Sequence, residues 1–304
     1  MARRWFAVGP LFASVLWGGM YVVSKWGFAS IPPVTLSFLR LFTGAVALLA
    51  IVRLVAPSRS FGRRDWLQFA GLGAMVGLTI VTQFVGTDLT SASQGSLLTV
   101  STPFFTLLFG IAFFDEAAGR RKLLGMALAG LGTLFVIAGQ YDLSAVPTSN
   151  LTGVLYLFLA SAGWAAYTVW GKPLVRRYSS LETATYSTVM AVPMVALLVP
   201  VELVTTDASL SGIVVTPLVI AAVLYLGVAS TAVAWYAWYK GLEYVDASTV
   251  AVFFFAQPVV GALLGAVLLD EQVGRGMALG GAVMCAGIYL VSTAGAETVD
   301  SSRS

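Results

Sequence analysis

The chain has 304 residues, of which 58% are hydrophobic and only 10% are charged, and its formal net charge is +3. A soluble domain carries roughly 25% charged residues, so this composition excludes a protein with a surface built for water. The lack of histidine and the single cysteine, Cys285, argue against a transition-metal site or a histidine-dependent catalytic triad. The charge is also too small and too dispersed for nucleic-acid binding. We therefore expect no cofactor, no metal and no nucleic-acid partner.

Hydrophobic segments of about 20 residues recur along the chain, which is the length of a helix that crosses a lipid bilayer. They predict an all-α integral membrane protein of ten transmembrane helices. The predicted helices cover residues 6–28, 34–55, 66–87, 92–113, 121–140, 151–171, 182–203, 214–239, 246–269 and 273–293. The first is longer than the core of a signal peptide, so we interpret it as a membrane helix. No break between helices is long enough for a soluble catalytic domain.

The stretch from residue 86 to residue 132 occurs twice. Gly86, Pro103, Asp115-Glu116, Gly125 and Gly132 return 155 positions later as Gly241, Pro258, Asp270-Glu271, Gly280 and Gly287. The first helix of each half matches at an offset of 147, where Trp17 and Lys25 correspond to Trp164 and Lys172. We therefore predict two five-helix domains, residues 1–143 and 150–304. Because each half has an odd number of helices, the second repeat is inverted, which is typical of alternating-access carriers.

The basic residues predict the orientation in the membrane. With the N-terminus in the cytoplasm, 14 of the 17 lysines and arginines lie in inner regions, and only Lys25 and Arg275 lie in outer ones. Basic residues favour the cytoplasmic side, so we predict that both termini are cytoplasmic. The remaining basic residue, Arg40, lies within the second predicted helix.

Two prolines and two acidic pairs occupy equivalent places in the halves. Pro103 and Pro258 lie near the middle of predicted helices and should kink them, as a hinge or as a fixed feature of packing. The neighbouring Ser101-Thr102 and Gln257 are candidates to satisfy the carbonyls that the prolines leave free. The pairs Asp115-Glu116 and Asp270-Glu271 precede the next helix of their half, and we expect them to cap its N-terminus.

Aromatic residues predict the lining of a cavity. Trp17 and Trp164 fall near mid-depth of their helices, away from the interfaces where tryptophan normally gathers. Tyr21 and Tyr167 lie one turn from them and share their faces. Together with Gln83 in the third helix, they suit a cavity for small organic solutes with an apolar portion; contact with other helices or lipid is the alternative.

Arg40 is the charged residue placed deepest in a predicted helix, and such residues are candidates for function. It could bind a substrate carboxylate or extend outward to the interface, and its position about two turns into the helix favours the second slightly. No Asp or Glu lies at the centre of a predicted span, so coupling to protons through a buried carboxylate has no visible residue.

The sequence resembles the EamA-type members of the drug/metabolite transporter superfamily over essentially its whole length. The resemblance is carried by Leu16-Trp17-Gly18-Gly19 and by the two stretches from Ala92 to Glu116 and from Ala247 to Glu271. It implies a bacterial or archaeal plasma-membrane carrier of amino acids or related metabolites, often directed outward, with a central cavity between the halves. The family's cavity lining corresponds here to Trp17, Tyr21, Pro103, Trp164 and Pro258, and further to Gln83 and Gln257.

We therefore expect an alternating-access exporter of amino acids with apolar or aromatic side chains, working as a monomer in the inner membrane, with the substrate and the bilayer as partners. The alternative is a carrier of phosphorylated sugars or nucleotide-sugars, which would need more cations in the cavity than Arg40, Lys25 and Lys240. A membrane-embedded enzyme would need a nucleophile, base or metal set at one depth. The sequence offers none, so we do not expect an enzyme.

Overall fold

The computed structural model describes residues 2–56, 59–90, 95–96, 98–116, 119–140, 151–206, 212–260 and 275–301. These residues form helices and no strand. The helices are α1 (Ala2–Phe28), α2 (Pro33–Val55), α3 (Arg63–Leu89), the 3₁₀ helix η1 (Thr99–Ser101), α5 (Thr102–Phe114), α6 (Arg120–Gln140), α7 (Leu151–Arg177), α8 (Ser180–Ala196), α9 (Val199–Thr205), α10 (Pro217–Leu224), the π-helix η5 (Tyr225–Val233), α11 (Ala234–Leu242), α12 (Ala247–Ala251), the 3₁₀ helix η6 (Val252–Phe255) and α14 (Arg275–Ser301).

Six helical segments of the described chain are long and apolar enough to cross a membrane: residues 7–28, 33–55, 63–89, 151–177, 180–205 and 217–242. Shorter apolar helices cover residues 99–114, 247–260 and 279–291. The prediction of an all-α membrane protein is therefore confirmed. The predicted fourth, eighth and ninth helices are not uniform α-helices, however, because 3₁₀ or π segments interrupt them.

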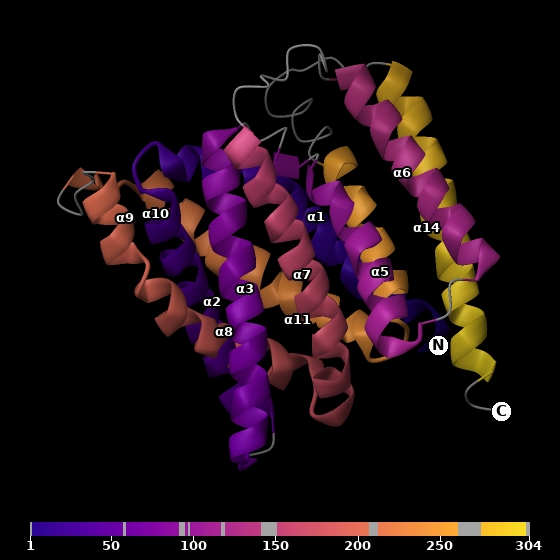
Figure 1. The fold of residues 1–304 in the computed structure, drawn as a ribbon, viewed down its shortest axis with the longest axis horizontal. Helices are drawn as coiled ribbons and strands as arrows, with labels where there is room; N and C mark the ends of the chain where they lie inside the picture. The colour runs from indigo at the N-terminus through magenta and orange to yellow at the C-terminus, as the bar shows by residue number, and fades with distance from the viewer. Residues whose placement is uncertain are drawn as a thin grey trace.

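The helices of the two halves interleave around one core (Figure 1). The helix α3 packs against α7 and α8, α1 packs against α11, and α2 packs against α8 and η5. Both ends of the chain lie toward the same end of the bundle (Figure 1). Because neighbouring helices come from different halves, any site at the centre is built from both.

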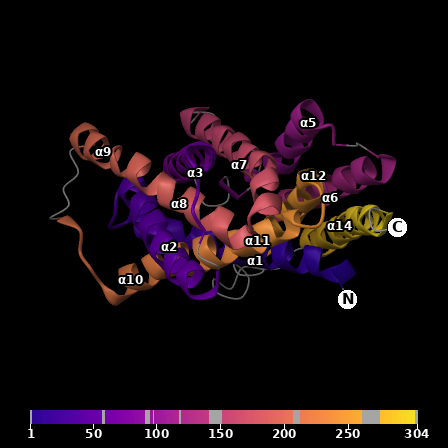
Figure 2. The ribbon, with the colours of Figure 1, turned by 90° about the horizontal axis from the view of Figure 1, so that it is seen from below.

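The last helices of the two halves, α6 and α14, lie side by side at one end of the molecule, and α9 and α10 lie at the other (Figures 1 and 2). Glycines let α6 and α14 approach closely. A Cβ added at Gly132 would meet the backbone of Met284, and one added at Gly287 would lie 2.6 Å from the carbonyl oxygen of Gly125. Gly125 and Gly287 lie in different repeats, so duplicated glycine positions face one another across this seam.

At each of the two predicted kinks, a short 3₁₀ helix precedes the proline. Pro103 follows η1 and Pro258 follows η6. Proline lacks the N–H that would pair with the carbonyl four residues earlier, which is that of Thr99 in one half and that of Phe254 in the other. The same residue type at equivalent positions therefore interrupts the fourth helix of each half in the same way.

The acidic pair of the first half caps a different helix from the one we predicted. The Glu116 carboxylate accepts a 2.9 Å hydrogen bond from the backbone N–H of Ala247, as well as hydrogen bonds from the backbone N–H and hydroxyl of Ser248. It thus caps α12, which belongs to the other half. Asp115 ends α5 in the left-handed conformation, with φ of 50°, which turns the chain at this point. The pair Asp270-Glu271 lies outside the described residues.

A second buried carboxylate joins the halves at the start of α2. Glu202 of α9 accepts hydrogen bonds from the backbone N–H groups of Val34 and Thr35, at 2.6 and 2.7 Å, and from the Thr35 hydroxyl at 2.8 Å. These N–H groups belong to the first turn of α2, which has no intrahelical partners for them. A buried carboxylate from the second half therefore completes the start of a helix in the first.

Candidate functional site

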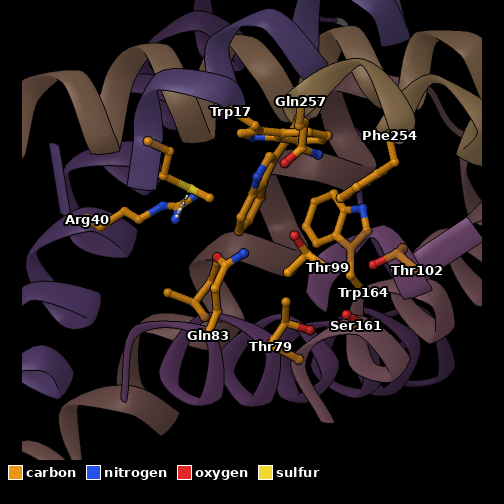
Figure 3. A pocket seen from close by; sticks show the side chains of 14 residues that line it. Trp17, Arg40, Thr79, Gln83, Thr99, Thr102, Ser161, Trp164, Phe254 and Gln257 are labelled. Carbon is orange, nitrogen blue, oxygen red and sulfur yellow. Dashed lines mark hydrogen bonds between the residues drawn. The ribbon is translucent and has the colours of Figure 1, made fainter. Parts of the chain in front are cut away.

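A small cavity lies at the centre of the molecule, where the two halves meet (Figure 3). Its volume of about 20 Å³ is room for roughly one water molecule, so its walls are nearly in contact. The side chains that line it are Trp17, Met20, Arg40, Thr79, Ile80, Gln83, Thr99, Thr102, Ala160, Ser161, Trp164, Trp235, Phe254 and Gln257.

Several of these residues are repeat equivalents. Trp17 and Trp164 correspond at the offset of 147, whereas Thr99 corresponds to Phe254 and Thr102 to Gln257 at the offset of 155. Equivalent positions of an inverted repeat converge on the axis that relates the halves. The cavity therefore lies on that axis. The two halves do not line it identically, because Thr99 and Thr102 of the first half are replaced by the larger Phe254 and Gln257 in the second.

Aromatic rings form one continuous wall of the cavity. Trp17 meets Trp164 edge to face, with ring centroids 5.1 Å apart, and it lies 5.3 Å from both Trp238 and Phe254. Trp164 in turn lies 5.4 Å from Trp235. Rings at such distances and angles attract one another, and together they provide a large apolar surface for a ligand.

The two equivalent tryptophans differ in their hydrogen bonds. The indole N–H of Trp17 donates to the carbonyl oxygen of Ser230 at 2.8 Å. The indole N–H of Trp164 is buried and has no hydrogen-bond partner in the part of the chain that the structure describes. The repeat is thus broken at its centre: one tryptophan is fixed to the π-helix, and the other presents an unused donor.

Arg40 projects into the cavity, and its side chain is only 1% exposed (Figure 3). Its Nε donates to the Thr231 hydroxyl at 2.8 Å, one Nη contacts the sulfur of Met20 at 2.8 Å, and the other lies 3.3 Å from the Ser230 carbonyl oxygen. The rings of Phe84 and Trp235 lie 5.4 and 6.0 Å from the guanidinium. Every contact that the structure gives Arg40 is with a neutral group.

No ion pair joins Arg40 to a carboxylate among the described residues. The expectation that Arg40 extends outward to the interface is therefore wrong. Its two oxygen acceptors, on Ser230 and Thr231, lie on η5, where the Thr231 hydroxyl also donates to the Leu226 carbonyl, five residues earlier. A buried cation without a counter-ion is costly, so such a residue is a strong candidate to bind an anionic group.

The structure places the nine candidate residues in two layers. Trp17, Arg40, Gln83, Trp164 and Gln257 line the cavity, whereas Tyr21, Pro103, Tyr167 and Pro258 do not. Tyr21 lies directly behind the wall, where its hydroxyl is 2.7 Å from that of Thr99 and accepts a 3.0 Å hydrogen bond from Gln83. Tyr167 packs 5.0 Å from Trp164 and bonds to the Ser187 hydroxyl at 3.0 Å. The tyrosines therefore position residues of the lining.

The polar neighbours of the prolines do not satisfy freed carbonyls as we expected. The amide of Gln257 and the hydroxyl of Thr102 are both buried without a hydrogen-bond partner among the described residues. Both point instead toward the cavity (Figure 3). Ser101 donates to the carbonyl of Leu98, three residues earlier.

Sequence reasoning missed part of the lining, and the repeat itself was the available signal. Thr102 is the equivalent of Gln257, and Ser161 is the equivalent of Ser14 at the offset of 147. Applying the offset to every candidate would have found Thr102. Nothing in the sequence indicates that Met20 contacts Arg40, because that contact depends on how α1 and α2 pack.

Two lysines considered in the sequence analysis, Lys25 and Lys172, lie away from the cavity. Lys25 donates to the carbonyls of Asp88 and Thr90 near the end of α3, at 3.0 and 3.2 Å. Lys172 lies 3.2 Å from Glu116 and 2.6 Å from Asp246.

Comparison with known proteins identifies the family. The model of the EamA-like transporter family matches residues 5–138 and again residues 151–293. The chain belongs to this family. The two matched segments agree with the duplication seen in the sequence, and together with the apolar helices they make the EamA-like chain a multi-pass membrane transporter of the drug/metabolite type.

Relatives of this EamA-like transporter match more than nine-tenths of its length. An Archaeoglobus fulgidus protein called an uncharacterized transporter is 27% identical over 284 residues, covering 91% of this chain and 94% of the relative. Proteins called probable amino-acid metabolite efflux pumps are 28% identical in Salmonella typhimurium and 26% identical in Escherichia coli, each match covering 92% of both chains. A solved crystal structure shares the fold, with a TM-score of 0.75 over 95% of this chain and 96% of its own at 20% identity.

Proposed function

We propose that this EamA-like transporter exports amino acids, preferring those with apolar or aromatic side chains, by exposing its central cavity to each face of the membrane in turn. The observation that carries the proposal is Arg40, a cation buried beside a wall of aromatic rings with only neutral contacts. The printed names of two relatives, which call them probable amino-acid metabolite efflux pumps, support the same substrate class.

In this proposal, the substrate carboxylate binds the guanidinium of Arg40 and replaces its contacts with Met20 and Ser230. A carboxylate and a guanidinium match in geometry and charge, which makes this exchange favourable. The Gln83 side chain donates to Tyr21 through its nitrogen, so its carbonyl oxygen is left to accept from the substrate ammonium. The apolar side chain then lies against Trp17, Trp164 and Trp235.

The cavity has to open before it can accept an amino acid, because about 20 Å³ is far below the few hundred Å³ of a ligand pocket. Inverted repeats open a central site to one side when the two halves hold different conformations. The unequal bonding of Trp17 and Trp164 supports such a difference between the halves. We propose that exchange of the two arrangements moves the site from one face to the other.

The distribution of basic residues and the duplication also support a proposal for the location, orientation and assembly of this transporter. We propose that it lies in the plasma membrane with both termini cytoplasmic, that residues 1–143 and 150–304 are its two domains, and that it works as a monomer. One chain already supplies both halves of the cavity, so a second copy is not required to complete it.

The test is counterflow of radiolabelled amino acids in proteoliposomes, with and without an imposed pH gradient, for wild type, Arg40→Gln and Arg53→Gln. Arg53 lies on the same helix but is exposed, so it is the matched control. We expect saturable exchange in the wild type and the control, and a loss of roughly 100-fold in Arg40→Gln, since charged hydrogen bonds contribute about 1.5–3 kcal/mol each. Equal exchange by wild type and Arg40→Gln, or no exchange of any amino acid after verified reconstitution, contradicts the proposal.

A second candidate, a carrier of phosphorylated sugars or nucleotide-sugars, also uses Arg40. It needs further cations, because a phosphate carries more charge than a carboxylate. Arg40 is the one cationic residue in the described lining, and Lys240 is engaged by Glu243 at 2.6 Å outside it. Inhibition of counterflow by sugar phosphates, but not by amino acids, would favour this candidate.

A further inference from the structure

Opposite Arg40, the cavity wall carries buried polar atoms without hydrogen-bond partners among the described residues. They are the indole N–H of Trp164, the hydroxyl of Thr102 and both amide atoms of Gln257. Gln257 is 2% exposed and Thr102 is 1% exposed, so solvent outside the protein does not satisfy them. Buried polar atoms normally find partners, and an unpaired set therefore needs an explanation.

The positions of these atoms separate them from the carboxylate site. In Figure 3, Arg40 enters the cavity from one side, whereas Trp164 and Thr102 lie on the other and Gln257 hangs between them. They come from α7, α5 and the helical segment after η6, and Arg40 comes from α2. The cavity thus has a cationic end and a neutral hydrogen-bonding end, with aromatic rings along its wall.

Other buried side chains of the described structure also have atoms without a partner, among them Ser14, Gln68 and Thr183, but four such atoms lie together at this end of the cavity. The equivalent tryptophan, Trp17, has its indole N–H bonded to Ser230, and Gln83 of the lining donates to Tyr21 behind it. The unpaired atoms gather where a ligand side chain would end if its carboxylate bound Arg40. A purely apolar side chain would leave them unpaired, and a site of this kind discriminates against ligands that lack the matching group.

We propose that the far end of the cavity recognises a hydrogen-bonding group on the substrate side chain. The preferred substrates are then amino acids whose apolar or aromatic side chain carries a hydroxyl, amide or ring N–H group, such as tyrosine over phenylalanine. Gln257 provides both a donor and an acceptor, Trp164 a donor, and Thr102 either. This inference rests on the proposed amino-acid function and names the class of amino acid within it.

The experiment is competition in the counterflow assay, in which unlabelled tyrosine and phenylalanine compete with labelled phenylalanine, and asparagine and leucine form a second pair of similar shape. In the wild type, we expect the polar member of each pair to compete about 10-fold better, the value of one neutral hydrogen bond. Gln257→Leu should remove that preference. The control Gln68→Leu, which changes a glutamine with an unpartnered oxygen on α3 outside the cavity, should keep it.

The outcomes separate this inference from the function beneath it. Exchange of amino acids with equal competition by polar and apolar members overturns the inference and leaves amino-acid transport standing. No exchange of any amino acid overturns both. If Gln257→Leu does not fold, Thr102→Val, which keeps the shape of the side chain, supplies the same test. A wild-type preference that persists unchanged in Thr102→Val then counts against the inference.

Discussion

Arg40 illustrates how far a single residue can be interpreted from sequence. Its place in a membrane helix marked it as a candidate. The sequence did not show that its side chain turns inward, because the acceptors on Ser230 and Thr231 are about 190 residues away in the chain. The roles of Trp17 and Trp164 were easier to predict, because the repeat pairs these residues and their depth in the helices excludes an interfacial position. The bond that distinguishes them was not predictable, since it reaches across the two halves to a backbone carbonyl.

The variant Arg40→Met should separate function from stability. Methionine fills a similar volume without a buried charge, and replacing a buried ion by an apolar side chain is often neutral or stabilising. We expect the midpoint of thermal unfolding to be unchanged or higher by about 2–4 °C, while substrate binding is lost. Differential scanning fluorimetry and counterflow measure the two effects. A variant that unfolds at much lower temperature would mean that Arg40 is mainly structural.

The two central tryptophans should respond differently to the same substitution. Trp17→Phe removes the hydrogen bond to Ser230, whereas Trp164→Phe removes no bond seen in the described structure. Both lose a similar ring area, so we expect Trp17→Phe to lower the free energy of unfolding by about 1 kcal/mol more than Trp164→Phe. Denaturation of the two variants side by side measures the difference, and equal stability would count against the asymmetry.

At the scale of elements, the sequence predicted the positions of the spans better than their internal form. Apolar length locates a membrane helix, but it does not reveal the π-helix η5. A comparison of the two halves does indicate an extra residue there. The spacing from Leu226-Gly227 to Gly241 is one residue longer than the spacing from Leu72-Gly73 to Gly86 in the first half. A π-helix accommodates such an extra residue inside a helix and is frequent at functional sites. Here it carries the acceptors of Arg40.

Deletion of Val228, an exposed residue of η5, would give the second half the spacing of the first. Removing the extra residue should convert the wide turns of η5 into α-helical turns and so shift the residues within them. We expect Ser230 and Thr231 to lose their register with Arg40, so that counterflow falls to background while circular dichroism stays helical. Substitution Val228→Ala is the control and should retain transport. Full transport in the deletion would show that the π-helix has no part in the site.

The close packing of α6 against α14 can also be tested, with two glycines of α14. Gly287 faces the backbone of Ala129 closely, whereas a Cβ added at Gly281 meets no described atom within 4 Å. We expect Gly287→Ala to destabilise the protein by about 1–3 kcal/mol through overpacking. Gly281→Ala should stabilise it by about 0.5–1 kcal/mol, the usual gain in a helix. Thermal unfolding of both variants measures this, and a stable Gly287→Ala would argue against the close seam.

At the scale of the whole molecule, duplication explains both what was predicted and what was not. The repeated landmarks predicted two halves, and the family match in two segments agrees with them. They also suggested that each half caps its own helices. In fact, Glu116 and Glu202 reach across the halves to α12 and α2, because the helices interleave and the nearest open N-terminus belongs to the other half. Contacts between repeats depend on packing, which the pattern within a repeat does not describe.

The central claim is that a substrate carboxylate binds Arg40 inside the aromatic cavity. Its most direct measurement is the thermal unfolding of purified protein titrated with phenylalanine or with phenylalaninamide, which keeps the ring and the ammonium but lacks the carboxylate. We expect phenylalanine to stabilise the wild type, by about 2.7 kcal/mol at 100 times its dissociation constant, and the amide to have little effect. In Arg40→Gln, neither compound should stabilise the protein. Equal stabilisation by both compounds, or stabilisation of Arg40→Gln by phenylalanine, would contradict the claim.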